Sequence, residues 1–144
     1  MLYQVLVWST KTRWEMVAHI QQLVANDFAA LNSTVIAQLH SEVPLIESIG
    51  HYIIEAGGKR MRPVLVLLTA NNLGYTGKDH IELATAIEFL HTATLLHDDV
   101  VDMSEMRRGR PTANTKWDNP SSVLVGDFIY SRAFELLVNI GDMA

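Results

Sequence analysis

The chain has 144 residues, which is the usual size of one domain. Hydrophobic residues make up 49% of it and charged residues 19%, a balance that excludes intrinsic disorder. The formal net charge of −5, from 11 basic and 16 acidic residues, disfavours a general nucleic-acid binder. There is no cysteine, so disulfide scaffolds and thiolate metal sites are excluded. No apolar run approaches the ~20 residues of a membrane-spanning helix, so we expect no integral membrane segment.

Residues 1–15 differ from the rest of the chain. They contain a short apolar stretch without the positively charged start of a signal peptide. Regular helical spacing of apolar residues begins only near Met16. We therefore expect residues 1–15 to be an extraneous or disordered N-terminus, with an extra strand as the alternative. The true start is then either Met1 or Met16.

Apolar residues recur every three or four positions along the remaining chain, which predicts a series of amphipathic helices. The predicted helices cover, in chain order, residues 17–39, 41–56, 64–72, 81–103 and 120–140. Ser41 is a candidate N-cap for the second helix, and Gly57 and Gly58 end it. No alternating strand pattern follows residue 16, so the predicted fold class is all-α. Several helices are apolar on more than one side, which predicts packing partners beyond this sequence.

A possible metal site lies near the end of the fourth predicted helix, in residues 98–102 (DDVVD). Asp98 and Asp102 are four residues apart and therefore share one face of a helix. Mg²⁺ accepts one or two carboxylates together with water and substrate phosphates. The alternative is an acidic helix end that only contacts solvent. His91 lies on the same stripe of the helix, about 20° from Asp98, where it could donate to a phosphate oxygen instead of packing in the core.

Two basic segments flank these carboxylates. Residues 57–63 (GGKRMRP) precede a predicted helix, and residues 106–111 (MRRGRP) follow the aspartates. Guanidinium groups form bidentate hydrogen bonds with phosphate, and helix N-termini favour anions. Each segment alone is equally consistent with a solvated basic loop. Acidic metal ligands between two basic segments together describe a site for a diphosphate and Mg²⁺.

The ordered set of motifs resembles the trans-polyprenyl diphosphate synthases, and within them the bacterial octaprenyl diphosphate synthases. The motifs are GGKRMRP at 57–63, His91 with DDVVD at 98–102, MRRG at 106–109, and SVLVGDFIY at 122–130. The resemblance implies an all-α isoprenoid synthase helical bundle, usually a homodimer in the cytoplasm. It also implies Mg²⁺-dependent condensation of isopentenyl diphosphate with an allylic diphosphate such as farnesyl diphosphate, giving octaprenyl diphosphate for quinone side chains.

The resemblance further implies roles for individual residues. Asp98 and Asp102 would be the catalytic, Mg²⁺-binding carboxylates, and Arg107 would contact the allylic diphosphate. The residues that would hold isopentenyl diphosphate are Lys59, Arg62, His91 and Arg108.

The length of the product is expected to depend on residues before the aspartates. In the resembled family, bulky aromatic residues four and five positions earlier form a floor that stops short products. Here these positions are Thr94 and Ala93, which lie ~6–7.5 Å along the helix from Asp98. Both are small, so we expect an open floor, a later stop near Phe89 and Leu90, and a product of about eight isoprene units by resemblance.

The chain departs from the family because no second aspartate-rich motif follows Asp102. Residues 16–144 therefore look like the N-terminal part of a polyprenyl synthase domain that ends before that motif. One acidic face without its partner should bind Mg²⁺ and diphosphate weakly. We expect the isolated fragment to be inactive and poorly folded, because its apolar helix faces lack their partners.

Three other functions are consistent with parts of the sequence. The chain could be a non-catalytic subunit of a heteromeric prenyl synthase, although such a subunit would not need intact metal and phosphate motifs. It could be a fragment of a class I terpene synthase, but the GGKR segment favours prenyl transfer. An RNA-binding helical module would use the same basic residues, but the net charge and the intervening carboxylates argue against it.

Overall fold

The computed structural model describes residues 10–142, and within that range the chain forms helices joined by short loops and one small hairpin. The elements are α1 (Thr10–Gln22), α2 (Ala25–Gln38), α3 (Pro44–Glu55), α4 (Met61–Asn72), α5 (Asp79–Val101), β1 (Met106–Arg107), β2 (Arg110–Pro111), α6 (Ala113–Lys116) and α7 (Asn119–Ile140). The all-α class predicted from the sequence is confirmed. None of the helices within residues 10–142 has the length and apolar character needed to cross a membrane.

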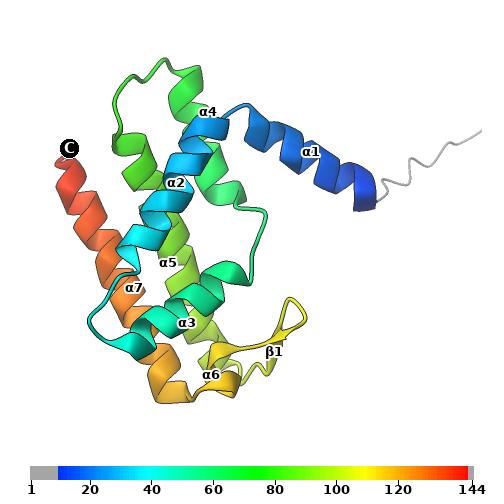
Figure 1. Cartoon of the computed structure of the whole chain (residues 1–144), viewed down its shortest axis with the longest axis vertical. Coiled ribbons are helices and arrows are strands. Elements are labelled where there is room, and N and C mark those ends of the chain that lie inside the picture. Colours follow the sequence, from blue (N-terminus) through cyan, green and yellow to red (C-terminus); the bar gives the residue numbers. More distant parts are fainter. Residues whose placement is uncertain (1–9, 143–144) are drawn as a thin grey trace, which may run out of the picture.

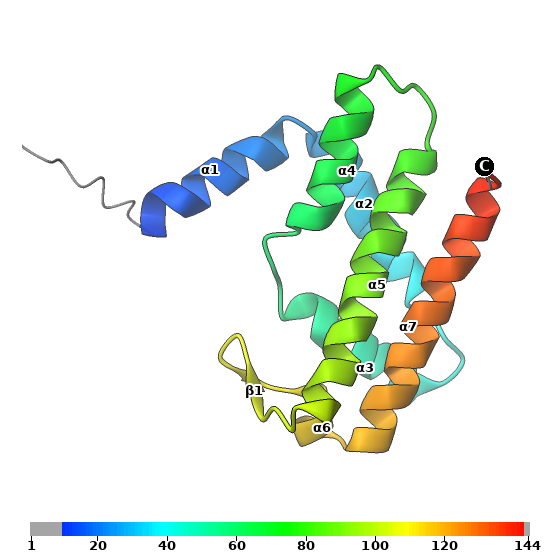
Figure 2. The same cartoon turned by 180° about the vertical axis from the view of Figure 1, so that it is seen from behind.

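Helix α5 is the centre of the arrangement (Figures 1 and 2). It runs beside α7 over most of its length, while α2, α4 and α6 also contact it. Helix α1 projects away from the other helices, and the hairpin lies at the end of α5 where the aspartates are. The largest fully buried side chains come from five different helices, so one core joins them. They include Leu31, Ile49, Leu67, Phe89, Leu96 and Ile129.

The predicted helix over residues 17–39 is wrong in one respect, because the structure divides it into α1 and α2. Leu23 and Val24 donate their backbone N–H groups to the carbonyls three residues earlier, at 3.2 Å each, so the last turn of α1 is tightened. Val24 then lies in the core, 3% exposed, while Leu23 remains 65% exposed. The apolar spacing hid the break because both segments are amphipathic.

The start of α1 is also earlier than expected. The helix begins at Thr10 and includes residues 10–15, which belong to the segment expected to be extraneous or disordered. Residues 1–9 of that segment lie outside the described residues. A start at Met1 or Met16 stays a prediction.

Ser41 is not the N-cap of α3, contrary to the sequence-based expectation. Val43 occupies that position, with extended backbone and no side-chain cap hydrogen bond. Ser41 lies before it, and its hydroxyl accepts from the Val43 N–H at 3.2 Å. Its own N–H donates to the Glu47 carboxylate in the first turn of the helix, at 3.1 Å. The serine therefore stabilises the turn before α3 rather than the first turn of the helix.

The hairpin at residues 106–111 was not predicted. Its strands pair Met106 with Pro111 and Arg107 with Arg110 in antiparallel register. The connecting Arg108 and Gly109 have φ angles of 53° and 76°, as in the primed turns that suit the twist of a two-residue hairpin. Two residues per strand are too few to give an alternating pattern in the sequence.

Helices α5 and α7 approach each other closely at Gly126. A Cβ at this position would lie 2.4 Å from Nε2 of His97, so a larger residue would require the His97 ring to move. The Ser122 hydroxyl, which is fully buried, donates to the Leu96 carbonyl at 3.3 Å. Asp118 caps the start of α7 by accepting from the Ser121 N–H at 2.7 Å. These contacts fix the register of the two long helices.

Apolar surface is exposed on several helices, as the sequence predicted. An open groove of about 1300 Å³ lies between α4, the start of α5 and the end of α7. Large apolar side chains that are at least two-fifths exposed include Leu65, Leu73, Val101, Leu124, Tyr130, Phe134 and Val138.

Two leucines of α5 test how far the core depends on this helix. Leu96→Ala is expected to lower the free energy of unfolding by about 2–5 kcal/mol, because the side chain is 1% exposed and its loss leaves a cavity. Leu83→Ala, the same change where the side chain is 37% exposed, is expected to cost about 0.5 kcal/mol. Urea unfolding followed by circular dichroism measures both. Equal losses would contradict this placement of the core.

Candidate functional site

The three aspartates at the end of α5 point in different directions. Asp98 and Asp102 are exposed, whereas Asp99 is 2% exposed. Asp98 lies in the last turn of the helix and Asp102 is its C-cap, with its N–H donating to the Asp98 carbonyl at 2.8 Å. The predicted common face for Asp98 and Asp102 is therefore present on a continuous helix. Asp99 lies about 100° around the helix from Asp98 and has a different role.

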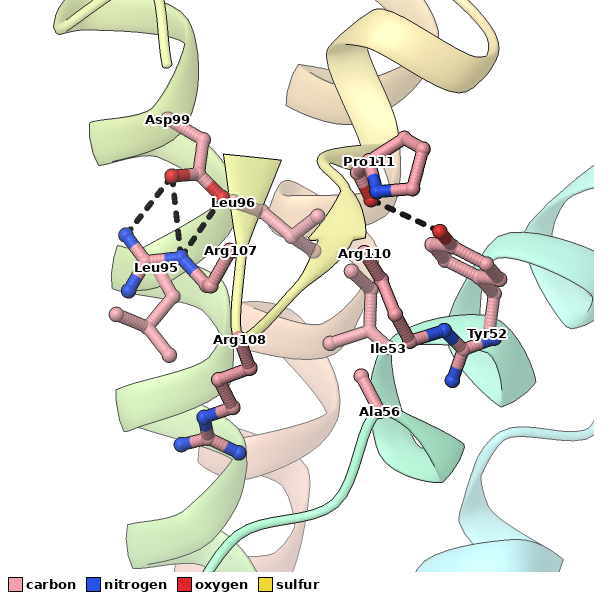
Figure 3. A pocket seen from close by; sticks show the side chains of 10 residues that line it. All are labelled: Tyr52, Ile53, Ala56, Leu95, Leu96, Asp99, Arg107, Arg108, Arg110 and Pro111. Carbon is pink, nitrogen blue, oxygen red and sulfur yellow. Dashed lines mark hydrogen bonds and ion pairs between the residues drawn. The ribbon is translucent and has the colours of Figure 1, made fainter. Parts of the chain in front are cut away.

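Asp99 binds Arg107 of the hairpin in a bidentate ion pair (Figure 3). The Arg107 Nε and Nη2 atoms donate to the Asp99 carboxylate at 2.8–3.1 Å. These hydrogen bonds, followed by the charges of Asp99, Asp98 and Asp102, raise the pKa of the Arg107 guanidinium above its ordinary value. Arg107 is therefore held in place by Asp99 with 38% of its side chain exposed, beside the two solvent-facing carboxylates.

Tyr52 of α3 holds the other strand of the hairpin. Its hydroxyl donates to the Pro111 carbonyl at 2.8 Å. The Arg110 guanidinium lies 4.4 Å from the centre of its ring, and the Lys116 ammonium lies 4.0 Å from it, both within the range of cation–π attraction. A small cavity of about 40 Å³ remains between α3, α5 and the hairpin. The hairpin is thus attached to α5 through one strand and to α3 through the other.

The two basic segments meet at Gly58 and Arg108. A Cβ at Gly58 would lie 2.6 Å from Nη1 of Arg108, so the absence of a side chain lets the guanidinium approach the backbone of the 57–60 loop. Arg108 itself has positive φ and points along α5, away from Asp99 (Figure 3). The structure therefore brings the segments 57–63 and 106–111 together, as the predicted diphosphate site requires.

His91 lies where these positive charges converge. Burial, together with the charges of Arg62, Arg108 and Arg107, lowers the pKa of its imidazole below the ordinary value, and Glu88 opposes this shift. The folded structure therefore favours the neutral imidazole, and the ring is harder to protonate than in the unfolded chain. A neutral imidazole can donate one N–H to a phosphate oxygen.

Lys59 and Arg62 are the other two residues predicted to hold isopentenyl diphosphate with His91 and Arg108. Arg62 is exposed in the first turn of α4 and Lys59 is half-buried in the loop before it. The Lys59 carbonyl accepts from Nε2 of Gln21 in α1 at 3.2 Å. This bond joins the loop to the projecting first helix.

The residues of the predicted floor do not all lie on one face. Thr94 is exposed, on the same side of α5 as Asp98, and its hydroxyl donates to the His91 carbonyl at 2.8 Å. Leu90 is half-buried one turn earlier. Ala93 and Phe89 are fully buried in the core. Ala93 therefore does not line the exposed face of α5 within this chain, because its Cβ packs against neighbouring helices.

Asp98 and Asp102 could bind a metal ion on only one side of that ion, because both come from the same helix. Within residues 10–142, no three histidine, aspartate or glutamate side chains gather as a ligand set. Asp98 and Asp102 provide two exposed carboxylates one helical turn apart. Hard oxygen donors with open surroundings suit Mg²⁺, which keeps several water ligands and uses one or two carboxylates.

Comparisons with known proteins agree with this geometry. Residues 43–144 match the family described as Polyprenyl synthetase. The chain belongs to this family. It is 52% identical over 124 residues to the octaprenyl diphosphate synthase of Escherichia coli, covering 86% of this chain but 38% of that protein. The matched portion is the N-terminal part, so the chain spans well under half the length of the relative.

Solved structures of polyprenyl synthases have the same fold. A decaprenyl diphosphate synthase from Rhodobacter capsulatus superposes with a TM-score of 0.86 at 52% identity, covering 88% of this chain and 39% of that one. A polyprenyl synthase from Caulobacter crescentus, solved with calcium and isoprenyl diphosphate, gives 0.85 at 43% identity over the same shares. The resemblance stated from the motifs and the isoprenoid synthase fold are therefore confirmed.

Two residues that support the site were missed by the sequence analysis. Asp99 had a detectable signal, since a residue next to Asp98 must lie about 100° around the helix and therefore off the stripe that Asp98 and Asp102 share. Tyr52 had none, because its partner Pro111 is 59 positions away. Its role depends on tertiary packing that local spacing does not reveal.

Neighbouring aspartates provide a test of this division of roles. Asp99→Ala is expected to lower the free energy of unfolding by about 2–3 kcal/mol, because it removes charge-assisted hydrogen bonds from Arg107. Asp98→Ala removes an exposed carboxylate and should change it by about 0.5 kcal/mol or less. Urea unfolding of both variants gives the comparison. A larger loss for Asp98→Ala would show that the two aspartates are wrongly assigned.

Proposed function

We propose that this chain supplies the N-terminal, substrate-binding part of a long-chain trans-prenyltransferase, which condenses isopentenyl diphosphate with an allylic diphosphate. The observation that supports this most directly is the meeting of the two basic segments around His91, on the helix that ends in Asp98 and Asp102. Neither basic segment alone would surround His91 with enough positive charge to bind a diphosphate. Membership of the polyprenyl synthetase family supports the same reaction class.

Each side chain has a distinct part in the proposal. Lys59, Arg62, His91 and Arg108 bind the diphosphate of isopentenyl diphosphate, because guanidinium, ammonium and imidazole N–H groups all donate to phosphate oxygens. Arg107, oriented by Asp99, contacts the allylic diphosphate. Asp98 and Asp102 are the residues that would hold Mg²⁺. When bound, that ion supplies positive charge to the leaving diphosphate.

The chemistry requires separation of charge, and these residues are suited to it. As the allylic carbon–oxygen bond breaks, negative charge grows on the departing diphosphate while positive charge grows on the allylic carbons. Arg107 stabilises the negative charge on the diphosphate, because its guanidinium is already fixed by Asp99 and does not have to reorganise. Lys59, Arg62, His91 and Arg108 hold isopentenyl diphosphate so that the double bond of this substrate attacks the allylic carbon. The carbocation formed by this attack then loses a proton.

The proposed product is a long prenyl chain, with octaprenyl diphosphate for quinone side chains as the specific candidate. Relatives named for octaprenyl and decaprenyl products support the long-chain class. The small, exposed Thr94 lies on the same side of α5 as Asp98 and leaves room beside Leu90 for a growing chain. Farnesyl diphosphate is the proposed primer, and a homodimer the proposed assembly of the complete enzyme.

The isolated 144-residue chain is proposed to be inactive. The chain covers 38% of the Escherichia coli relative, and it leaves apolar helix faces and the carboxylates of Asp98 and Asp102 exposed. Substantial prenyl transfer by the purified chain would contradict this part of the proposal.

A chimera tests the catalytic role of Asp98. This chain would replace the matching N-terminal part of the Escherichia coli enzyme, and incorporation of labelled isopentenyl diphosphate would be measured. Asp98→Asn is expected to lower kcat by about 100-fold or more, because charge stabilisation at the leaving diphosphate is lost. Glu82→Gln, at the other end of the same helix, is the control and should leave kcat unchanged. Equal turnover of the two variants would refute the assignment.

Product length tests the role of Thr94. In the same chimera, Thr94→Phe is expected to shorten the main product by several isoprene units, because an aromatic ring would fill the exposed side of α5. Thr34→Phe in α2 is the matched control, since that threonine makes a similar hydroxyl-to-backbone bond far from the aspartates. Chromatography of the dephosphorylated products gives the lengths. An unchanged distribution with Thr94→Phe would contradict the proposed floor.

A further inference from the structure

Arg60 differs from Arg62 in the 57–63 segment because most of its side chain is covered by the protein. Only 11% of it is exposed, and its Nη1 atom lies 3.1 Å from Oε1 of Glu88, which is 13% exposed. Removing two charges from water is costly, and a buried pair of this kind is weak evidence for added stability. The effect of the Arg60–Glu88 ion pair is therefore expected on the position of the loop rather than on the stability of the fold.

The backbone at Arg60 is unusual as well. Its φ and ψ angles are 49° and 33°, in the left-handed region, at the N-cap of α4. This conformation is unfavourable for a residue with a Cβ and persists where surrounding contacts require it. The ion pair with Glu88 is the contact that α5 provides. It fixes the point at which the loop turns into the helix.

The residues on either side of Arg60 are those proposed to bind isopentenyl diphosphate. Lys59 precedes it, and its carbonyl is already held by Gln21. Arg62 follows it in the first turn of α4. An anchor between them limits the movement of both side chains, which reduces the entropy lost when a diphosphate binds.

Glu88, the partner of Arg60, lies on α5 close to the proposed diphosphate site. It lies one turn before His91 and therefore on the same side of the helix. Its negative charge, with the positive charges of Arg62, Arg107 and Arg108, acts on the His91 imidazole. The ion pair is thus adjacent to the proposed diphosphate site, and Glu88 neutralises Arg60 there.

We propose that Arg60 and Glu88 are positioning residues, whose ion pair holds the 57–62 loop against α5 so that Lys59, Arg62 and His91 bind one diphosphate. This inference rests on the proposed function, because it concerns the same diphosphate site. The alternative is that Arg60 itself binds the diphosphate and Glu88 only restrains it. The two accounts predict opposite effects of removing the Glu88 charge.

Calorimetric titration with inorganic diphosphate at low salt separates them, in the chimera in which this chain replaces the matching N-terminal part of the Escherichia coli enzyme. Arg60→Met and Glu88→Gln are each expected to weaken binding by about tenfold, as loss of one well-placed charged contact does. The reversed pair, Arg60→Glu with Glu88→Arg, should recover most of that loss. Glu135→Gln, which removes the acid of the exposed Arg132–Glu135 pair on α7, is the matched control and should not weaken binding.

Hydrogen exchange provides the second readout. The Val64 amide hydrogen, which is donated to the Arg60 carbonyl at 3.1 Å, should exchange at least about tenfold faster in Glu88→Gln than in the unaltered chimera, with little change in α7. Tighter or unchanged diphosphate binding by Glu88→Gln would overturn the proposal and favour Arg60 as a direct ligand. Failure of the unaltered chimera to bind diphosphate would also overturn it. Diphosphate binding without prenyl transfer in the chimera would refute the proposed function alone.

Discussion

The bidentate ion pair between Asp99 and Arg107 connects the central helix to the hairpin, and the arrangement of the site depends on it. The pair joins a buried carboxylate to a guanidinium that remains 38% exposed. Because Asp99 turns inward, Asp98 and Asp102 turn outward on the same helix. Because Arg107 is fixed, the turn that follows it places Arg108 against Gly58. One interaction therefore separates the acidic face from the basic face of the site and keeps the two faces adjacent.

The remaining contacts hold the basic segments from outside the site. Tyr52 attaches the second hairpin strand to α3 through Pro111, with Arg110 and Lys116 on its ring. Gln21 attaches the 57–60 loop to α1. Three cations in these segments, Arg60, Arg107 and Arg110, thus have structural partners within the chain.

Much of the fold could be predicted from the sequence because the helices are amphipathic and bounded by glycine, proline or aspartate. Helices α3, α4, α5 and α7 lie where the apolar spacing predicted them, to within a few residues. The break after Gln22 could not be predicted, since apolar spacing continues across it. The hairpin could not either, because each of its strands has two residues and its stability comes from Asp99 and Tyr52. At the site, the common face of His91, Asp98 and Asp102 followed from helix geometry. The inward direction of Ala93 depends on which helices surround α5.

The central claim is that the carboxylates and the cations form one site for a metal ion and a diphosphate. It is tested most directly by measuring the affinity of the chain for inorganic diphosphate with and without Mg²⁺. If the claim holds, Mg²⁺ strengthens diphosphate binding by about tenfold or more, and the double variant Asp98→Asn with Asp102→Asn abolishes this coupling while weaker, metal-independent binding remains. Diphosphate binding that is the same with and without Mg²⁺ in the unaltered chain would contradict it.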